Sequence, residues 1–312
     1  MSVNYNKNSP SIKTRYAKLH QKENKNYTPE TLSLTSQLLS INPEFYTIWN
    51  YRRQILTEGI FPLKSATEVN DLITADLNLT MSALRQNPKV YWVWNHRRWC
   101  LEHVPENPGE DQSNWRKMSW VKELRVIESF LDADPRNFHA WNYRRYVLQS
   151  PYVDHTWEQE LNYTTRKIES NFSNFSAWHQ RSKVYTSLWE RGINDEELKS
   201  IKNQEFNLIK QAIYTDPGDQ SIWLYHRWLV GEGKDEELLR REIEMIEELL
   251  SIEPDRCLDT LIHYKTLLLR HRYSLKDRDE CITLSSRLRQ LDPFRDGRYQ
   301  DIANELLSMP NN

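Results

Sequence analysis

Glycine is scarce in this sequence, with 7 among 312 residues. β-rich folds and dinucleotide-binding folds need glycine in turns and phosphate loops, so its scarcity argues against both classes. Long apolar runs are also missing, since no segment approaches the roughly 18 residues that span a bilayer. The stretch from Met1 to Asn26 contains no apolar core of a signal peptide. We therefore expect a cytoplasmic protein that does not insert into a membrane.

An excess of charge of one sign is absent as well. The 42 basic and 44 acidic side chains leave a formal net charge of −2, which gives no reason to expect a nucleic-acid partner. The cysteines, Cys100, Cys257 and Cys281, are far apart and form no C-x-x-C pair, so we expect reduced thiols. No histidine pairs with a cysteine at a spacing typical of metal ligands, and we predict no metal or other cofactor in this chain.

Large aromatic residues are abundant, with 12 Trp and 16 Tyr. Many belong to a repeated motif around a tryptophan, which reads Trp-Asn-x-Arg-Arg in three copies. The tryptophans are separated by 45, 47, 37 and 45 residues, and a further copy at Glu253-Pro254 has Thr260 in the tryptophan position. The five copies lie at 42–53, 87–98, 134–145, 171–181 and 216–227, with tryptophans at Trp49, Trp94, Trp141, Trp178 and Trp223.

Each copy predicts a pair of helices. The Asn-Pro or Asp-Pro step ends one helix, because the residue before proline avoids the α region, and the tryptophan stretch begins the next. Thr28 with Pro29 is typical of a helix start, and Asn194 with Glu197 of a capping box. Stacked pairs bury their aromatics between neighbours. We predict an all-α fold, a right-handed α-α superhelix or crescent solenoid of stacked helical hairpins.

The predicted domain organisation is simple. Residues 1–27 form a mobile tail, and residues 28–312 form one helical-repeat solenoid of at least five repeats with a degenerate C-terminal cap. The tryptophan and the arginine pair share one helix face and serve packing. The positions two and three residues before each tryptophan are expected to lie between helices, with side chains that point into the concave face. No phosphate-loop, paired-carboxylate or H-E-x-x-H motif is present, so the residues alone describe a scaffold without a self-contained active site.

The series Pro-x-x-[Tyr/Phe]-x-x-Trp-x-x-Arg, repeated at this spacing over about residues 28 to 300, resembles the repeat of protein prenyltransferase α subunits. In that family a crescent of helical hairpins wraps around a separate β subunit. That β subunit is an α-α barrel and carries the zinc and most of the isoprenoid pocket. The resemblance implies a β-subunit partner, with zinc in that partner.

The second repeat distinguishes the two types of α subunit in this family. In the type shared by farnesyltransferase and geranylgeranyltransferase I it reads Pro-Lys-Asn-Tyr-Gln-Val-Trp. Its lysine approaches the isoprenoid diphosphate, and its glutamine holds the carboxylate of a CaaX substrate. Lys89 and Tyr91 match, but Trp92 replaces the glutamine, and an indole does not donate an amide proton in the same geometry. The repeats look more like the Rab geranylgeranyltransferase type, in its compact, fungal-like form.

The third repeat supplies further candidates, since it matches a Lys-Asn-Tyr-His stretch that lies near the lipid and diphosphate in the family. The resemblance implies catalytic roles for Lys89, which would stabilise the leaving diphosphate, and for Tyr91 and His139. It implies substrate contacts for a larger set, namely Lys89, Tyr91, Trp92, Arg136, Asn137 and Phe138.

The implied function is transfer of geranylgeranyl from geranylgeranyl diphosphate to C-terminal cysteines of Rab GTPases, which an escort protein presents. The enzyme would be an obligate α/β heterodimer. Two alternatives stay open. One is the shared α subunit of the CaaX prenyltransferases, which Trp92 disfavours. The other is a non-catalytic helical-repeat adaptor, which the period of about 45 residues and the Lys89-x-Tyr91 pattern disfavour.

Overall fold

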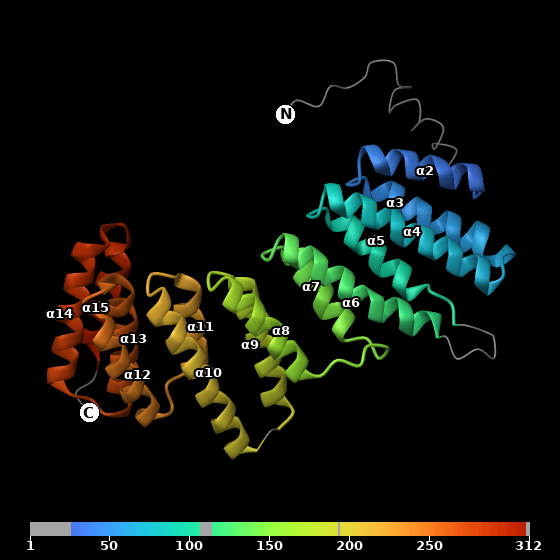
Figure 1. Ribbon diagram of the computed structural model, residues 1–312. Helices are drawn as coiled ribbons and strands as arrows, with labels where there is room; N and C mark the ends of the chain where they lie inside the picture. The colour runs from blue at the N-terminus through green and yellow to red at the C-terminus, as the bar shows by residue number, and fades with distance from the viewer. Residues whose placement is uncertain (1–25, 107–113, 193, 310–312) are drawn as a thin grey trace. The chain divides into compact units, whose positions relative to one another are not determined.

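The computed structural model describes residues 26–106, 114–192 and 194–309, and all regular structure in these ranges is helical (Figure 1). The described chain divides into two compact units, one ending at His155 and the other beginning at Thr156. Each even-numbered helix packs against the odd-numbered helix that follows it. Each unit is therefore a stack of helical hairpins, which agrees with the predicted all-α class.

The described part of the first unit contains three hairpins. In the first of them, α3 continues into a π-helical turn, Ile55–Ile60, and a short 3₁₀ turn, Phe61–Leu63. The helices are α2 (Pro29–Ile41), α3 (Tyr46–Gln54), α4 (Ala66–Gln86), α5 (Tyr91–Glu102), α6 (Trp115–Ala133) and α7 (Phe138–Leu148).

The second unit contains four hairpins among its described residues. The degenerate copy at Glu253-Pro254 forms α13, with Pro254 in its first turn and Thr260 buried in place of a tryptophan. A last pair, α14 and α15, follows it. The helices are α8 (Trp157–Ser170), α9 (Phe175–Glu190), α10 (Asp195–Thr215), α11 (Gln220–Val230), α12 (Glu236–Leu249), α13 (Pro254–His271), α14 (Leu275–Leu291) and α15 (Asp296–Ser308), with a 3₁₀ turn at Pro293–Arg295.

Both predicted helix starts are present, but the capping box predicted at the second is not. The Thr28 side chain accepts a hydrogen bond from the Thr31 backbone N–H at 3.3 Å, and Pro29 is the first residue of α2. The Asn194 side chain accepts from the Glu197 backbone N–H at 2.9 Å, so the cap is confirmed. The capping box is wrong, because the Glu197 carboxylate accepts from the Asn194 side-chain amide and not from its backbone.

The predicted tail falls mostly outside the described residues, which begin at position 26. Its last two residues contact α3. The Tyr51 hydroxyl donates to the carbonyl oxygen of Asn26 at 3.1 Å, and the rings of Tyr27 and Tyr51 lie 6.2 Å apart between centroids. The described structure of the first unit therefore starts two residues before Thr28.

The five motif tryptophans make the same contact in every repeat. Each indole N–H donates to the backbone carbonyl six residues earlier, in the turn that precedes its helix, at 2.7 to 2.9 Å. None of the five side chains is more than 4% exposed. The tryptophan therefore fixes the inter-helix turn to the helix that follows it, which agrees with the packing role expected from the sequence.

The first arginine of the motif joins neighbouring hairpins. Arg97 in α5 donates to the carbonyl of Leu77 and the hydroxyl of Thr80 in α4, at 2.8 and 3.0 Å. Its guanidinium also forms a two-point ion pair with Glu123, in the next hairpin. Arg52 and Arg181 repeat this arrangement with Asp76 and Glu205.

In the second repeat, the second arginine of the motif behaves differently. Arg98 is exposed and pairs with Glu102, one turn along α5, at 3.0 Å. The prediction that the two arginines of the motif share one helix face is therefore wrong for this repeat, because Arg97 is buried and Arg98 is exposed. The position four residues after the tryptophan is not exposed in every repeat, because Arg53 donates to His96 and Arg227 donates to Asp259, each in the following hairpin.

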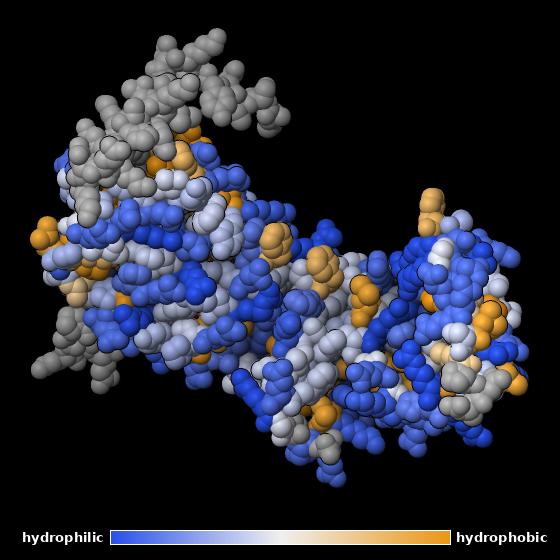
Figure 2. All heavy atoms as spheres, turned by 180° about the vertical axis from the view of Figure 1, so that it is seen from behind, coloured by the Kyte–Doolittle hydropathy of each residue, from blue (hydrophilic) through white to orange (hydrophobic). Residues whose placement is uncertain are grey.

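The molecular surface is predominantly polar on the face shown in Figure 2, where hydrophobic residues form small separate patches. Among the described residues, no helix combines the length and the apolar character needed to cross a bilayer.

Candidate functional site

Most of the predicted site residues lie together in the first unit, where the turn between α4 and α5 meets the start of α7. Lys89 is at the centre of this site. Its side chain is 66% exposed, and its Nζ lies 3.2 Å from Oδ2 of Asp134. Asp134 was not predicted as a site residue. It is the aspartate of the Asp-Pro step in the third repeat, and a carboxylate at that turn was the signal that could have indicated it.

Lys89 sits beside a helix N-terminus that has no side-chain cap. The N-cap of α5 is Val90, whose side chain accepts no hydrogen bond. The first backbone N–H groups of a helix point outward and carry partial positive charge, so an uncapped end attracts anions. The Lys89 ammonium adds a full charge next to it. The arrangement favours an anionic ligand at this turn.

Exposed aromatic side chains belong to the same turn and to the start of α7. Tyr91 and Phe138 are 55% and 58% exposed although both are large rings. Trp92 lies between Tyr46 and Tyr91, with ring centroids 5.3 and 5.1 Å away. Large exposed rings in a row form an apolar surface that suits a hydrocarbon or a partner protein.

The backbone of these residues differs from the prediction. Tyr46, Tyr91, Phe138 and Phe175, three positions before their tryptophans, are the first residues of α3, α5, α7 and α9. They were expected between helices. The structure instead fixes them in the first helical turn, which gives their side chains a defined direction.

Asn137 and His139 hold the turn in place. Asn137 is fully buried and caps α7 by accepting from the backbone N–H groups of His139 and Ala140, while its amide donates to the Pro88 carbonyl at 3.1 Å. The predicted substrate contact of Asn137 is therefore replaced by a positioning role, because both ends of its amide are occupied. Burial lowers the pKa of His139. A hydrogen bond with the Lys89 backbone acts in the opposite direction but is the smaller effect.

The remaining residues of the predicted set lie at the rim of this site. Arg136 is exposed, and its backbone N–H donates to the Asp134 carboxylate at 3.2 Å. Phe138 lies against His139, with ring centroids 4.1 Å apart, and His139 lies 6.2 Å from Tyr91. Lys89, Tyr91, Trp92, Phe138 and His139 thus form one continuous cluster, and we refer to them as the Lys89 cluster.

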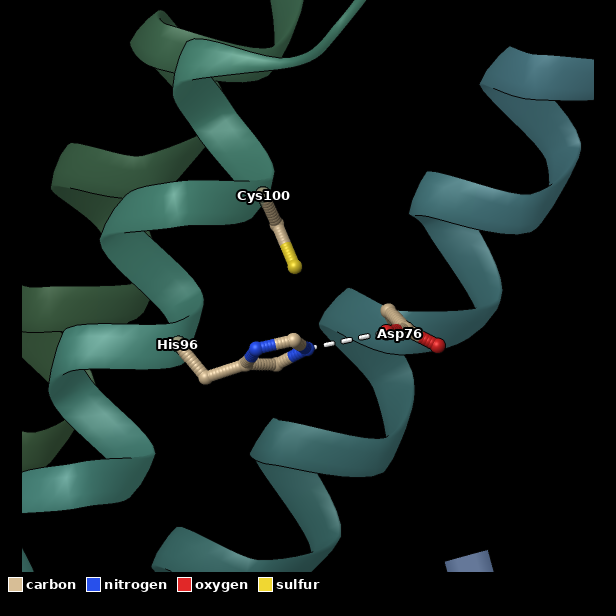
Figure 3. Close-up of side chains that lie close together, drawn as sticks. All are labelled: Asp76, His96 and Cys100. Carbon is tan, nitrogen blue, oxygen red and sulfur yellow. Dashed lines mark hydrogen bonds and ion pairs between the residues drawn. The ribbon is translucent and has the colours of Figure 1, made fainter. Parts of the chain in front are cut away.

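A second group of reactive side chains lies inside the first unit. Asp76, His96 and Cys100 converge there with potential ligand atoms within 4.8 Å of one another (Figure 3). His96 and Cys100 stand four residues apart on α5, a spacing that the sequence reasoning overlooked. One turn of a helix brings such residues to the same face.

The surroundings of this group do not fit a metal ion. Arg52 donates to both oxygens of Asp76, at 2.9 and 2.5 Å, and Arg53 donates to Nδ1 of His96 at 3.2 Å. Burial acts to raise the pKa of Asp76, but hydrogen bonds from His96 and Arg52 outweigh it and hold that pKa at about 2. Burial lowers the pKa of His96 to about 4 and raises that of the Cys100 thiol. The group is a buried ion-pair network with a neutral thiol beside it.

The repeats of this chain match a known family over five segments. Residues 28–59, 73–104, 120–151, 157–188 and 202–232 match the protein prenyltransferase alpha subunit repeat. The chain belongs to the protein prenyltransferase α-subunit family. This membership confirms the family predicted from the sequence and argues against the alternative of a non-catalytic adaptor.

Curated relatives within this family are type-2 α subunits. Geranylgeranyl transferase type-2 subunit alpha of Schizosaccharomyces pombe is 36% identical, over 91% of this chain and 88% of that protein. The protein of the same name from Dictyostelium discoideum is 33% identical, over 93% and 89%. The human protein of that name is 40% identical, over 67% of this chain and 35% of its own length.

A solved prenyltransferase structure shares the fold. The chain from Candida albicans protein geranylgeranyltransferase-I complexed with GGPP superposes with a TM-score of 0.73, covering 98% of this chain and 97% of that one. The two sequences are 21% identical. The superposition confirms the predicted fold of stacked helical hairpins for this prenyltransferase α-subunit chain.

Proposed function

We propose that this chain is the α subunit of a Rab geranylgeranyltransferase and acts in the cytoplasm as an obligate heterodimer with a β subunit. The dimer transfers geranylgeranyl from geranylgeranyl diphosphate to C-terminal cysteines of Rab GTPases, which an escort protein presents. The zinc that activates the cysteine belongs to the β subunit. The type-2 names of the most similar curated relatives support this assignment.

The observation that carries the proposal is the position of Lys89. Its exposed side chain stands beside the uncapped start of α5, and the exposed rings of Tyr91 and Phe138 belong to the same cluster. A prenyl diphosphate has a doubly charged head and a long hydrocarbon tail. The Lys89 cluster offers both kinds of contact within a few residues.

The proposed role of Lys89 is to stabilise the negative charge that develops on the leaving diphosphate. The cysteine sulfur of the Rab attacks C1 of the prenyl group, a C–S bond forms, and the C–O bond to the diphosphate breaks. The bonding electrons leave with the diphosphate oxygen. A fixed cation near this oxygen stabilises the transition state more than the ground state, because negative charge grows there. Arg136, exposed on the next repeat, provides a second cation at the rim.

Trp92 supports the Rab type over the CaaX type. Its indole is packed between Tyr46 and Tyr91 and has one N–H donor and no acceptor. A glutamine amide at this position would offer two donors and an acceptor to a peptide carboxylate. An enzyme whose substrate is held by an escort protein does not need that contact.

The substitution Lys89→Ala in the heterodimer tests the role of the site. We expect kcat for Rab geranylgeranylation to fall about tenfold or more, as for other single stabilising groups. Lys64→Ala is the matched control, since Lys64 is also an exposed lysine of the first unit paired with a carboxylate, Glu68. Equal activity of the Lys89→Ala enzyme and wild type, with the heterodimer intact, would refute this role.

A further inference from the structure

A groove lies between the first helices of two neighbouring hairpins, α4 and α6, and we refer to it as the α4–α6 groove. Its volume is about 900 Å³. Asn70 and Thr74 line it from α4, and most of the remaining lining comes from α6. Both helices pack against α5. None of its lining residues belongs to the Lys89 cluster.

The α6 wall combines apolar and basic side chains. Met118 and Val121 are 61% and 41% exposed, although hydrophobic side chains of this kind are usually buried. Lys117, Lys122 and Arg125 lie along the same exposed stripe. None of the described residues that line the groove is acidic, and these three cations pair with no acid in the described part of the chain.

The exposed residues of α6 that line the groove differ in composition from the exposed face of α12. The corresponding face of α12, also the first helix of its hairpin, has charged residues of both signs at its exposed positions, including Glu237, Arg240, Glu244 and Glu247. Mixed charge is typical of a helix face that meets only water. The α6 stripe instead has hydrophobic residues and a single sign of charge, a composition typical of a binding surface.

We propose that the α4–α6 groove binds an acidic amphipathic helix of a partner protein. The stretch from Asn114 to Ser129, which lines the groove, extends about 22 Å at a rise of 1.5 Å per residue. It accommodates about four turns of a bound helix. The apolar stripe of that helix contacts Met118 and Val121, and its carboxylates face Lys117, Lys122 and Arg125. This inference does not depend on the proposed transferase function, because the groove and the Lys89 cluster share no residue.

Charge and shape favour a peptide over a lipid surface. The apolar side chains line a hollow between two helices, whereas a membrane needs them on a protruding face. An anionic vesicle would contact the cations without filling the space between α4 and α6. Variants distinguish the two partners. Binding of a peptide should depend on Val121, which lines the groove, as well as on the cations, whereas binding of an anionic vesicle should depend on the cations alone.

Fluorescence anisotropy on the purified full chain, alone or with its β subunit, provides the test. The probe is a labelled model peptide of about 16 residues, with leucine at i, i+3, i+4 and i+7 and glutamate elsewhere. We expect saturable binding, weakened about tenfold by Lys122→Glu and by Val121→Asp. Lys276→Glu, a reversal at an exposed lysine of α14, should leave the dissociation constant unchanged.

Three outcomes would overturn the proposal. One is the absence of saturable binding, and another is equal binding of a peptide with the same composition in scrambled order. The third is binding to phosphatidylserine vesicles that Lys122→Glu abolishes, with no binding of the peptide. Circular dichroism of each variant confirms that it folds, so that loss of binding reports on the groove.

Discussion

The Arg97 guanidinium and the Glu123 carboxylate form a buried two-point ion pair, with Nη2 and Oε2 2.8 Å apart, and both side chains are almost fully excluded from water. The pair connects α5 to α6, which belong to consecutive hairpins. Removing one member of such a pair leaves a buried charge without compensation. Arg97 therefore connects the second repeat to the third through a buried ion pair.

The substitution Arg97→Ala should accordingly destabilise the protein by about 3–5 kcal/mol. Arg98→Ala, at the adjacent residue, removes an exposed pair with Glu102 and should cost less than about 1 kcal/mol. Urea unfolding followed by circular dichroism measures both values. Similar free energies of unfolding for the two variants would contradict the difference in role between the first and second arginine.

If Lys89 binds the diphosphate as proposed, Asp134 should oppose that binding, because its carboxylate lies 3.2 Å from the ammonium. Asp134→Asn removes this charge but keeps an oxygen that can accept from the Arg136 backbone. We expect tighter binding of geranylgeranyl diphosphate and a change in stability below about 1 kcal/mol, since the pair is exposed. Titration calorimetry on the heterodimer measures the affinity.

Asp71→Asn serves as the control for this experiment, since Asp71 is an exposed carboxylate of α4. Its affinity for the diphosphate should equal that of wild type. Weaker binding by Asp134→Asn than by Asp71→Asn would show that Asp134 positions Lys89 and does not compete with the ligand.

The His96 network should make stability depend on pH. Burial lowers the pKa of His96 from 6.5 to about 4 in the folded protein. The unfolded chain therefore binds the proton first as the pH falls, and stability is lost between about pH 6.5 and 4, by up to about 3 kcal/mol. His263, whose pKa burial also lowers to about 4, adds to this loss.

The variant His96→Gln isolates the contribution of His96, since glutamine is neutral at all these pH values. The urea midpoint of this variant should fall less steeply than that of wild type between pH 7 and pH 5. Equal slopes would show that folding leaves the pKa of His96 unchanged, in conflict with its burial.

The cysteines should be unreactive while the chain is folded. Burial raises the pKa of the Cys100 thiol well above its ordinary value, and it raises the pKa values of Cys257 and Cys281 to about 12. The thiolate is the reactive form, so a thiol reagent at mildly alkaline pH should label the native protein slowly. The exposed position of Met118 gives a control, because Met118→Cys should add one fast-reacting thiol. Rapid native labelling of Cys100 would contradict the closed packing around His96.

The sequence pattern predicted the helical hairpins well, because the local signals are strong. The Pro step, the tryptophan six residues later and the arginine three residues after that all act within one turn and one helix. Their spacing therefore identifies the repeat without knowledge of tertiary structure. The first helical turn was placed too late, since Tyr91 and Phe138 already belong to their helices.

The long-range partners could not be predicted in the same way. Arg52 pairs with Asp76, which lies 24 residues later in the sequence, and Lys89 pairs with Asp134 in the next repeat. The chain has 44 acidic residues, and which of them faces a given cation depends on how neighbouring helices are packed. The burial of Asn137 also depends on how neighbouring helices are packed, so its role as a helix cap that contacts Pro88 could not be predicted from the sequence.

Reconstitution of the heterodimer tests the central claim most directly. The chain is co-expressed with a type-2 β subunit, and transfer of labelled geranylgeranyl is measured on a Rab GTPase with escort protein and on a CaaX peptide without it. We predict a stoichiometric complex that modifies the Rab only when the escort protein is present and does not modify the CaaX peptide. Failure of the two subunits to associate, or efficient transfer to the CaaX peptide, would contradict the assignment.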